Sequence, residues 1–149
     1  MTHIRLRAAQ TDDIEAIFDI RTSVRQNHLS HAELAQRGIT PDAVAALISA
    51  GPCSWIAEIS SVAAAFAMVD MEEGSVFAMF VRPEFEGRGL GRRLMAEAEA
   101  ALFAKHDVIW LLTDRRPGVR AQGFYSALGW REAGIGDDGD IRYEKTRKS

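Results

Sequence analysis

Residues 76–95, VFAMFVRPEFEGRGLGRRLM, combine an apolar run, a glycine-rich loop and a helical pattern. Every position from Val76 to Val81 is apolar, so both faces of a strand there would be apolar, which is typical of a buried central strand. Pro83 cannot donate a ladder hydrogen bond, so the strand should end before it. Apolar residues then recur every four positions, at Leu90, Leu94, Ala98 and Leu102. The stretch therefore predicts a strand, a loop and the start of a helix.

Glycine occupies alternate positions of the loop, at Gly87, Gly89 and Gly91. Because glycine has no Cβ and the first-turn amides of a helix carry partial positive charge, a phosphate group fits such a loop. Two common phosphate loops are excluded: G-x-G-x-x-G needs glycine where Arg92 and Leu94 stand, and the string G-x-x-x-x-G-K-[S/T] is absent. A tight turn without a ligand is the alternative. An anionic ligand is favoured because cations surround the helix start, at Arg88, Arg92 and Arg93.

The composition limits the class of protein. With 149 residues, 47% of them apolar, the chain is expected to form a single domain over residues 1–149 with a sizeable core. A net charge of -3 gives no general attraction to nucleic acid or to an anionic membrane. The longest apolar run, Val62–Val69, is too short to span a bilayer. Cys53 is the only cysteine, so no internal disulfide is expected and a cytoplasmic location is predicted.

The N-terminal part predicts a strand and two helices. Ile4–Ala8 alternates apolar and charged residues as a strand does, and Thr11 is a plausible cap for a helix that continues to Val24. Thr40 and Pro41 open a second helix, whose buried stripe is expected to be Val44, Leu47 and Ile48. The polar stretch between the helices, residues 21–38, is either a ligand-facing segment or, more commonly, a solvated helix end with a connector.

The remaining pattern is rich in strands. Apolar or alternating runs predict them at Trp55–Ile59, Val62–Asp70, Val108–Leu112, Trp130–Ala133 and Ile141–Lys145. Another short helix should begin at Pro117, and the closing hairpin offers a possible edge for a homodimer. The fold class predicted is α/β, with a mixed, mostly antiparallel central sheet of about seven strands flanked by about four helices. The strand–helix–strand unit over residues 76–112 should contain two parallel strands, and open sheets bind ligands beyond the carboxyl ends of such strands.

Two motifs stand in order along the chain, Glu86–Gly91 and Ala121–Trp130. Together they resemble the Gcn5-related N-acetyltransferase (GNAT) family, whose acetyl-coenzyme A loop runs [Q/R]-x-x-G-x-[G/A] and whose later helix carries A-x-x-x-Y-x-x-x-G-[F/W]. The order of the elements is similar across nearly the whole chain. The resemblance implies a GNAT-like acyl-CoA N-acyltransferase fold, acetyl-CoA (coenzyme A) as cofactor, and direct transfer of the acetyl group to a primary amine of a small molecule or peptide.

The resemblance also implies roles for individual residues. Tyr125 would donate a proton to the leaving thiolate, the alternative being a core aromatic. The pyrophosphate would lie on the loop amides and the pantetheine along the strand, so the expected cofactor-binding residues are Met79, Phe80, Val81, Gly87, Arg88, Gly89, Leu90, Gly91, Arg92, Arg120 and Phe124. Arg120 would either reach the cofactor or cap its helix. Glu86 replaces the usual Gln or Arg and Gly118 an Asn of many members, although a branch of the family carries E-G-R-G with R-A-x-x-F-Y.

The general base and the acceptor are less defined. A lysine-like amine has a reference pKa near ~10.4 and must lose a proton to attack a thioester, yet the strand SVFAMFV has no carboxylate. Asp114, Asp70, Glu58 and an ordered water remain open as the base. Arg21 and Arg25, four apart on one helix face, are expected to contact an anionic acceptor together with Asp114, or else form a solvated face. No metal site is expected, because the histidines at helical spacing lack a third ligand.

An N-acetyltransferase is therefore the predicted function. The absence of an obvious base leaves a second hypothesis, a catalytically silent acyl-CoA-binding sensor or partner domain of the same fold. A phosphate-binding turn that serves a different nucleotide is a third, weaker hypothesis.

Overall fold

The computed structural model describes residues 3–24, 29–51, 53–113, 120–136 and 139–147, and side chains 120–122 are outside this description. One seven-stranded sheet runs through the molecule in the order β1-β2-β3-β4-β5-β7-β6. Its strands are β1 (Ile4–Ala8), β2 (Ser54–Ile59), β3 (Val62–Asp70), β4 (Ser75–Val81), β5 (Val108–Thr113), β6 (Arg131–Ile135) and β7 (Ile141–Thr146). All neighbouring pairs are antiparallel except β4 and β5, which are parallel. The mixed, mostly antiparallel sheet predicted from the sequence is confirmed.

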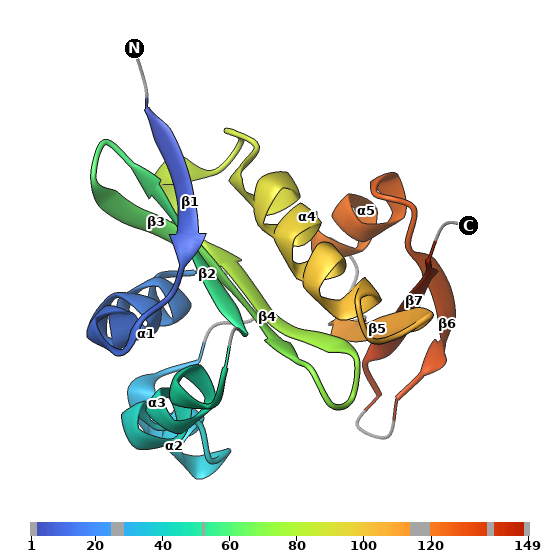
Figure 1. The fold of residues 1–149 in the computed structure, drawn as a ribbon, viewed down its shortest axis with the longest axis horizontal. Helices are drawn as coiled ribbons and strands as arrows, with labels where there is room; N and C mark the ends of the chain where they lie inside the picture. Colours follow the sequence, from blue (N-terminus) through green and yellow to red (C-terminus); the bar gives the residue numbers. More distant parts are fainter. Residues whose placement is uncertain (1–2, 25–28, 52, 114–119, 137–138, 148–149) are drawn as a thin grey trace.

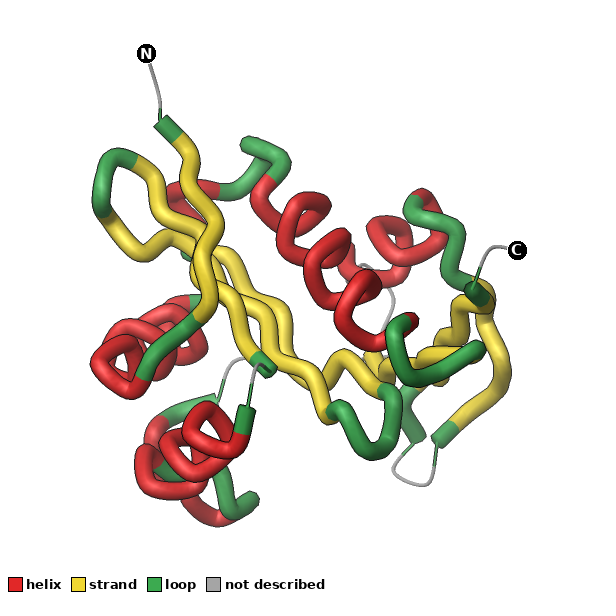
Figure 2. Tube along the Cα trace, in the orientation of Figure 1, coloured by secondary structure: helices red, strands yellow, loops and turns green. Residues whose placement is uncertain are grey.

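Helices cover both faces of this sheet (Figures 1 and 2). The described residues form five α-helices rather than about four: α1 (Ile14–Ser23), α2 (His31–Gln36), α3 (Pro41–Ala50), α4 (Leu90–Phe103) and α5 (Arg120–Ala127). Three of them, α1 to α3, share a core cluster with Ile56, Phe66 and Met68 on one face. On the other face, the buried stripe of α4 packs against β2, β3 and β5. The sheet therefore separates two apolar layers.

The unpredicted helix is α2, which lies in the polar stretch between α1 and α3. It begins with a capping box: the Ser30 hydroxyl accepts from the Glu33 amide, and the Glu33 carboxylate accepts from the Ser30 amide. Leu34 is fully buried and anchors the helix to the core. In α3, Thr40 caps the helix as predicted, but Leu47 is 46% exposed, so its predicted place in the buried stripe is wrong. The mostly polar sequence of α2, with a single buried apolar residue, gave no periodic pattern from which this short helix could be predicted.

Strand β4 lies in the middle of the sheet, but it is not buried along its length. Ser75 and Val76 are buried, Phe77 is 49% exposed, and the residues from Ala78 to Val81 are partly buried. The cause is its neighbour, because β5 pairs with β4 at a single register position, Ser75 opposite Trp110. The prediction of a central strand is confirmed, whereas the prediction of complete burial is wrong, since the two strands separate.

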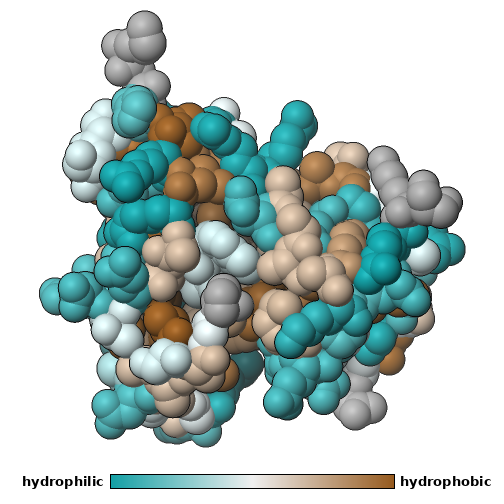
Figure 3. Space-filling view, in the orientation of Figure 1, coloured by the Kyte–Doolittle hydropathy of each residue, from teal (hydrophilic) through white to brown (hydrophobic). Residues whose placement is uncertain are grey.

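None of the helices in the described segments has the length and apolar character that a bilayer crossing requires. Hydrophilic surface covers the loop before α4, at the top of the view in Figure 3.

Candidate functional site

The separation of β4 from β5 opens a fork in the sheet. The Trp110 amide donates to the Gly74 carbonyl at 3.1 Å at the closed end, and beyond Ser75 the ladder between the strands stops. At the open end, the Arg82 amide donates to the Ala64 carbonyl of β3 at 2.9 Å. Because amides alternate in direction along a strand, those of Met79 and Val81 point away from β3 and into the fork. The fork can therefore receive an extended ligand by strand-like pairing.

Side chains of β4 alternate between the two faces at this point. Met79 packs on the face that carries α4, together with Phe124 of α5. A Cβ added to Gly91 would lie 3.2 Å from Cζ of Phe124 and 3.8 Å from Sδ of Met79. Phe80 points to the opposite face, where its ring centroid lies 5.8 Å from that of Phe66. The structure thus brings Met79, Gly91 and Phe124 together, as three of the predicted cofactor-binding residues, and puts the side chain of Phe80 on the other side of the sheet.

The loop before α4 adopts the conformation that its glycines allow. Gly87 and Gly89 have φ values of 77° and 79°, in the left-handed region, and the space beside each is open to 4 Å. Gly89 is the N-cap of α4 without a side-chain cap hydrogen bond, and the first turn contains no acidic residue. First-turn amides have no intrahelical partner, so those of Leu90 to Arg92 form a ready site for an anion. The Leu90 side chain itself is buried in the core, so only its backbone can contact a ligand.

Charged side chains surround this helix start. Arg88, Arg92 and Arg93 are exposed, and the Arg88 guanidinium lies 5.5 Å from the centroid of the Phe85 ring. Glu86, the departure from the family motif, is also exposed. The three arginines therefore favour a positive electrostatic potential at the helix start, which attracts an anionic ligand.

Tyr125 lies in an aromatic cluster beside this region. Its ring centroid is 5.4 Å from Phe124, 6.3 Å from Trp130 and 6.0 Å from Tyr143. Burial raises the pKa of Tyr125 to about 12. The phenol therefore stays protonated at neutral pH and can act as a hydrogen-bond or proton donor.

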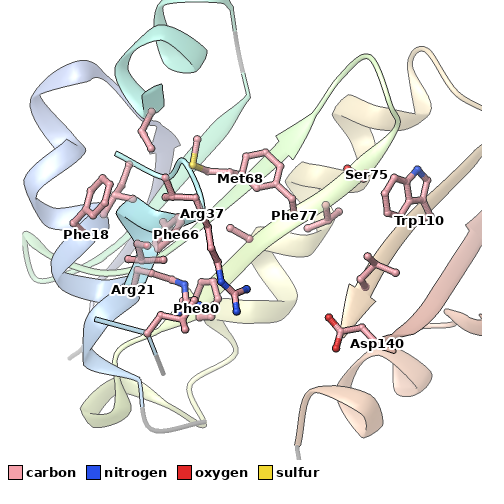
Figure 4. Close-up of a pocket in the computed structure, with 18 residues that line it drawn as sticks. Phe18, Arg21, Arg37, Phe66, Met68, Ser75, Phe77, Phe80, Trp110 and Asp140 are labelled. Carbon is pink, nitrogen blue, oxygen red and sulfur yellow. The ribbon is translucent and has the colours of Figure 1, made fainter. Parts of the chain in front are cut away.

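A cavity of about 300 Å³ lies on the other face of β4, between α1, α2 and the β5–β7 side of the fork (Figure 4). Its bed is apolar and aromatic, including Phe66, Phe80 and Trp110. Three of its lining residues are charged: Arg21, Arg37 and Asp140. Figure 4 shows Arg21 and Arg37 over Phe80, with Asp140 facing them from the opposite side.

Arg21 is held in an unusual setting for a guanidinium. It is only 9% exposed, and its Cζ lies 4.2 Å from the centroid of the Phe80 ring. Burial and the positive charge of Arg37 both lower the pKa of Arg21. The predicted acceptor contact Arg21 thus lies in the cavity, together with Arg37 and Asp140, which the sequence did not single out. The one sequence signal for Arg37 was its place in the polar stretch between α1 and α3.

Other predicted residues lie elsewhere. The amides of Glu72 and Glu73 donate to the Asp70 carboxylate at 3.0 and 3.1 Å, so Asp70 caps the β3–β4 turn at the closed end of the fork. Glu58 lies on β2 and pairs with Arg7 at 3.4 Å, two strands from β4. Their geometry gives neither a place at the open end. Arg25, Asp114, Gly118 and the side chain of Arg120 lie outside the described residues. Within the described part of the chain, no three potential metal ligands gather.

The family comparison decides which fold this is. Residues 50–132 match the family model described as the acetyltransferase (GNAT) domain, which is more than half of the chain. The chain belongs to the GNAT acetyltransferase family. The matched range includes both strands of the fork, the glycine loop, α4 and Tyr125. The family resemblance predicted from the two motifs is thereby confirmed.

Solved structures show the same GNAT fold. PaiA N-acetyltransferase from Thermoplasma acidophilum, in complex with coenzyme A, superposes with a TM-score of 0.79 at 16% identity, covering 97% of this chain and 99% of that one. YncA, a putative acetyltransferase from Salmonella typhimurium with its cofactor acetyl-CoA, gives 0.73 at 19% identity, covering 99% and 95%. The ribosomal-protein-S18-alanine N-acetyltransferase from Escherichia coli gives 0.68 at 19% identity, covering 95% and 91%. At these identities the likeness establishes the fold.

Proposed function

We propose that this GNAT protein is an N-acetyltransferase that transfers the acetyl group of acetyl-CoA directly to a primary amine. Family membership supports an acyltransferase, and similar structures were solved with coenzyme A or acetyl-CoA. The observation that carries the proposal is the juxtaposition of an open fork with an uncapped, cation-rich helix start. Both lie where one extended, diphosphate-containing molecule would contact them together.

The residues present fit coenzyme A on two counts. The amides of the α4 first turn and the open space beside Gly87 and Gly89 suit the pyrophosphate, with Arg88 and Arg92 as its counter-charges. The amides of Met79 and Val81 suit the amide groups of pantetheine, which would extend the sheet into the fork. Phe124 and Met79 form an apolar wall beside Gly91, against which the chain of the coenzyme would pass.

Acetyl-CoA would supply the activated acetyl group: the amine nitrogen forms the C–N bond as the C–S bond breaks, and the proton lost from nitrogen leaves with coenzyme A as its thiol. Keeping a lysine-like amine neutral at pH 7 costs roughly 4 to 5 kcal/mol. The apolar cavity lowers this cost because it disfavours a charged ammonium. The Tyr125 phenol, protonated well above neutral pH, would donate its proton to the departing sulfur, and the proton lost from nitrogen would restore the phenol, so one proton passes from amine to thiol overall.

A thermal-shift experiment tests the coenzyme site. Acetyl-CoA should raise the melting temperature, and Gly89→Val should abolish that rise, because a β-branched residue at φ 79° displaces the loop amides. Gly38→Val is the matched control: Gly38 has φ 80° and equally open space, at the end of α2. Both variants should lose roughly 1 to 2 kcal/mol of stability from backbone strain, but only Gly89→Val should lose the shift. An undiminished shift in Gly89→Val would place the coenzyme elsewhere.

A catalytically silent acyl-CoA-binding domain is the second candidate. Two observations favour it: β4 carries no carboxylate, and Tyr125 is packed in an aromatic cluster, as a structural residue would be. Release of coenzyme A thiol with a panel of amines distinguishes the two. Tight binding of acetyl-CoA without thiol release for any acceptor would support the sensor.

A further inference from the structure

The cavity on the α1–α3 face of β4 has charges of opposite sign on its two sides. Arg21 from α1 and Arg37 after α2 form one side, and Asp140 from the turn before β7 forms the other (Figure 4). These are the charged residues among those that line it in the described part of the chain. The aromatic residues of the lining, including Phe66, Phe80 and Trp110, form the bed of the cavity. The lining is thus polar at its edges and apolar in the middle.

Two guanidinium groups at one side of a small cavity repel each other electrostatically. Arg21 is nearly buried, its cation lies over the Phe80 ring, and the charge of Arg37 lowers its pKa further. Two guanidinium groups on one side give that side of the cavity a positive potential, which attracts an anionic group. Paired arginines are also the usual partners of carboxylates, because guanidinium groups present several donors to two oxygens. The arginine side of the cavity therefore suits an anionic group of the bound molecule.

The opposite side carries a hydrogen-bond acceptor for an amine. Figure 4 shows the Asp140 carboxylate facing the arginines across the opening. A carboxylate there can accept hydrogen bonds from the N–H groups of an amine and so orient it. The volume of about 300 Å³ is at the small end of ligand cavities, so the occupant is a small molecule.

We propose that the acceptor amine is a small amino acid-like molecule: a primary amine that also carries a carboxylate and an apolar or aromatic body. This inference rests on the proposed function and names its acceptor class. Arg21 and Arg37 bind the carboxylate, the aromatic bed of the cavity takes the body, and Asp140 orients the amine. Polyamines and simple alkylamines carry no carboxylate for the positive side of the cavity to bind, so the cavity favours them less.

Matched acceptors test the proposal. Thiol release from acetyl-CoA is measured with phenylalanine against phenethylamine, with leucine against isoamylamine, and with spermidine. Removing the carboxylate should lower kcat/KM about 10- to 100-fold, the loss expected for hydrogen bonds to a charged group. Direct binding of the same compounds is measured by calorimetry, with and without coenzyme A, so that a slow acceptor is still detected.

One arginine variant identifies the contact. Arg37→Gln changes an exposed residue and should not disturb folding; it should lower kcat/KM for the carboxylated acceptors about 10-fold or more, mainly through KM, and leave the decarboxylated amines unchanged. Arg131→Gln, an exposed arginine on β6, is the control and should change neither.

The outcomes separate this inference from the proposed function. Equal or better turnover of decarboxylated amines, or no binding of any carboxylated amine by protein that takes acetyl-CoA, would overturn the acceptor class and leave the acetyltransferase assignment intact. Failure to bind acetyl-CoA would overturn the proposed function, and carboxylate-dependent binding that Arg37→Gln removes would still support the cavity assignment.

Discussion

The Tyr125 ring packs among aromatic residues, and its hydroxyl is the group that can donate a hydrogen bond. Its neighbours Phe124, Trp130 and Tyr143 are all aromatic, and the cluster continues into the core under α4. Since burial raises its pKa to about 12, the phenol holds its proton more firmly in the folded protein than at the ordinary value of 10.0. Stabilisation from the neutral phenol is therefore complete below about pH 10 and lost as pH rises through 12.

Tyr125→Phe should lower kcat about 10²- to 10³-fold, because it removes the donor to the leaving sulfur and keeps the ring. Acetyl-CoA binding and the melting temperature at pH 7 should hardly change. The variant should also lose the alkaline destabilisation between pH 10 and 12. Steady-state kinetics and denaturation at both pH values measure this. Full activity in Tyr125→Phe would make this residue a packing residue only.

Predictability at this scale depended on how far apart the residues lie in the sequence. The loop glycines and Phe124 with Tyr125 could be predicted, because each motif is contiguous and its spacing follows from a turn or a helix. Arg37 and Asp140 could not be, because they come from opposite ends of the chain and meet only when β7 inserts beside β5. A charge pair across a cavity leaves no periodic signal.

At the scale of elements, the apolar pattern of the sequence does not reveal the fork between β4 and β5. The run from Val76 to Val81 predicted a strand correctly, but alternation cannot tell whether a neighbour pairs along the whole strand. Met79 and Phe80 are apolar because each faces a packed layer or a cavity, while the strand edge between them is open. The seven-stranded sheet was predictable from the patterns; the point where it splits was not.

The arginines at the start of α4 lower the stability of the helix but favour the binding of an anion. Arg92 near a helix N-terminus opposes the helix dipole, so Arg92→Gln should stabilise the protein without coenzyme by a few tenths of a kcal/mol. The same change should weaken acetyl-CoA binding about 3- to 10-fold and reduce its dependence on salt. Arg131→Gln is the control. Melting temperatures with and without acetyl-CoA, at low and high salt, measure both effects, and a parallel shift in both states would contradict the role of Arg92.

At the scale of the whole molecule, β4 separates the two proposed ligand sites, one on each face of the sheet. Met79, with Gly91 and Phe124, faces the α4 layer, whereas Phe80, with Arg21, faces the cavity. The two sides are in contact through the backbone of β4 at the open end of the fork. The acyl group and the amine would meet there, and among the described residues the side chains proposed for the two sites are different.

This arrangement predicts independent contributions from the two faces. Gly89→Ala should weaken coenzyme binding and Arg37→Gln acceptor binding, so their losses in kcat/KM should multiply in the double variant to within about twofold, as for sites with no shared partners. Gly89→Ala with Arg92→Gln is the matched comparison: both act on the helix start of α4, so their losses should not multiply. Kinetics of the three single and two double variants at varied acetyl-CoA and phenylalanine decide the matter. A loss of kcat/KM in Gly89→Ala/Arg37→Gln that is no larger than the loss in the less active single variant would mean that the two faces bind one ligand. Only a shared ligand couples residues that the sheet separates.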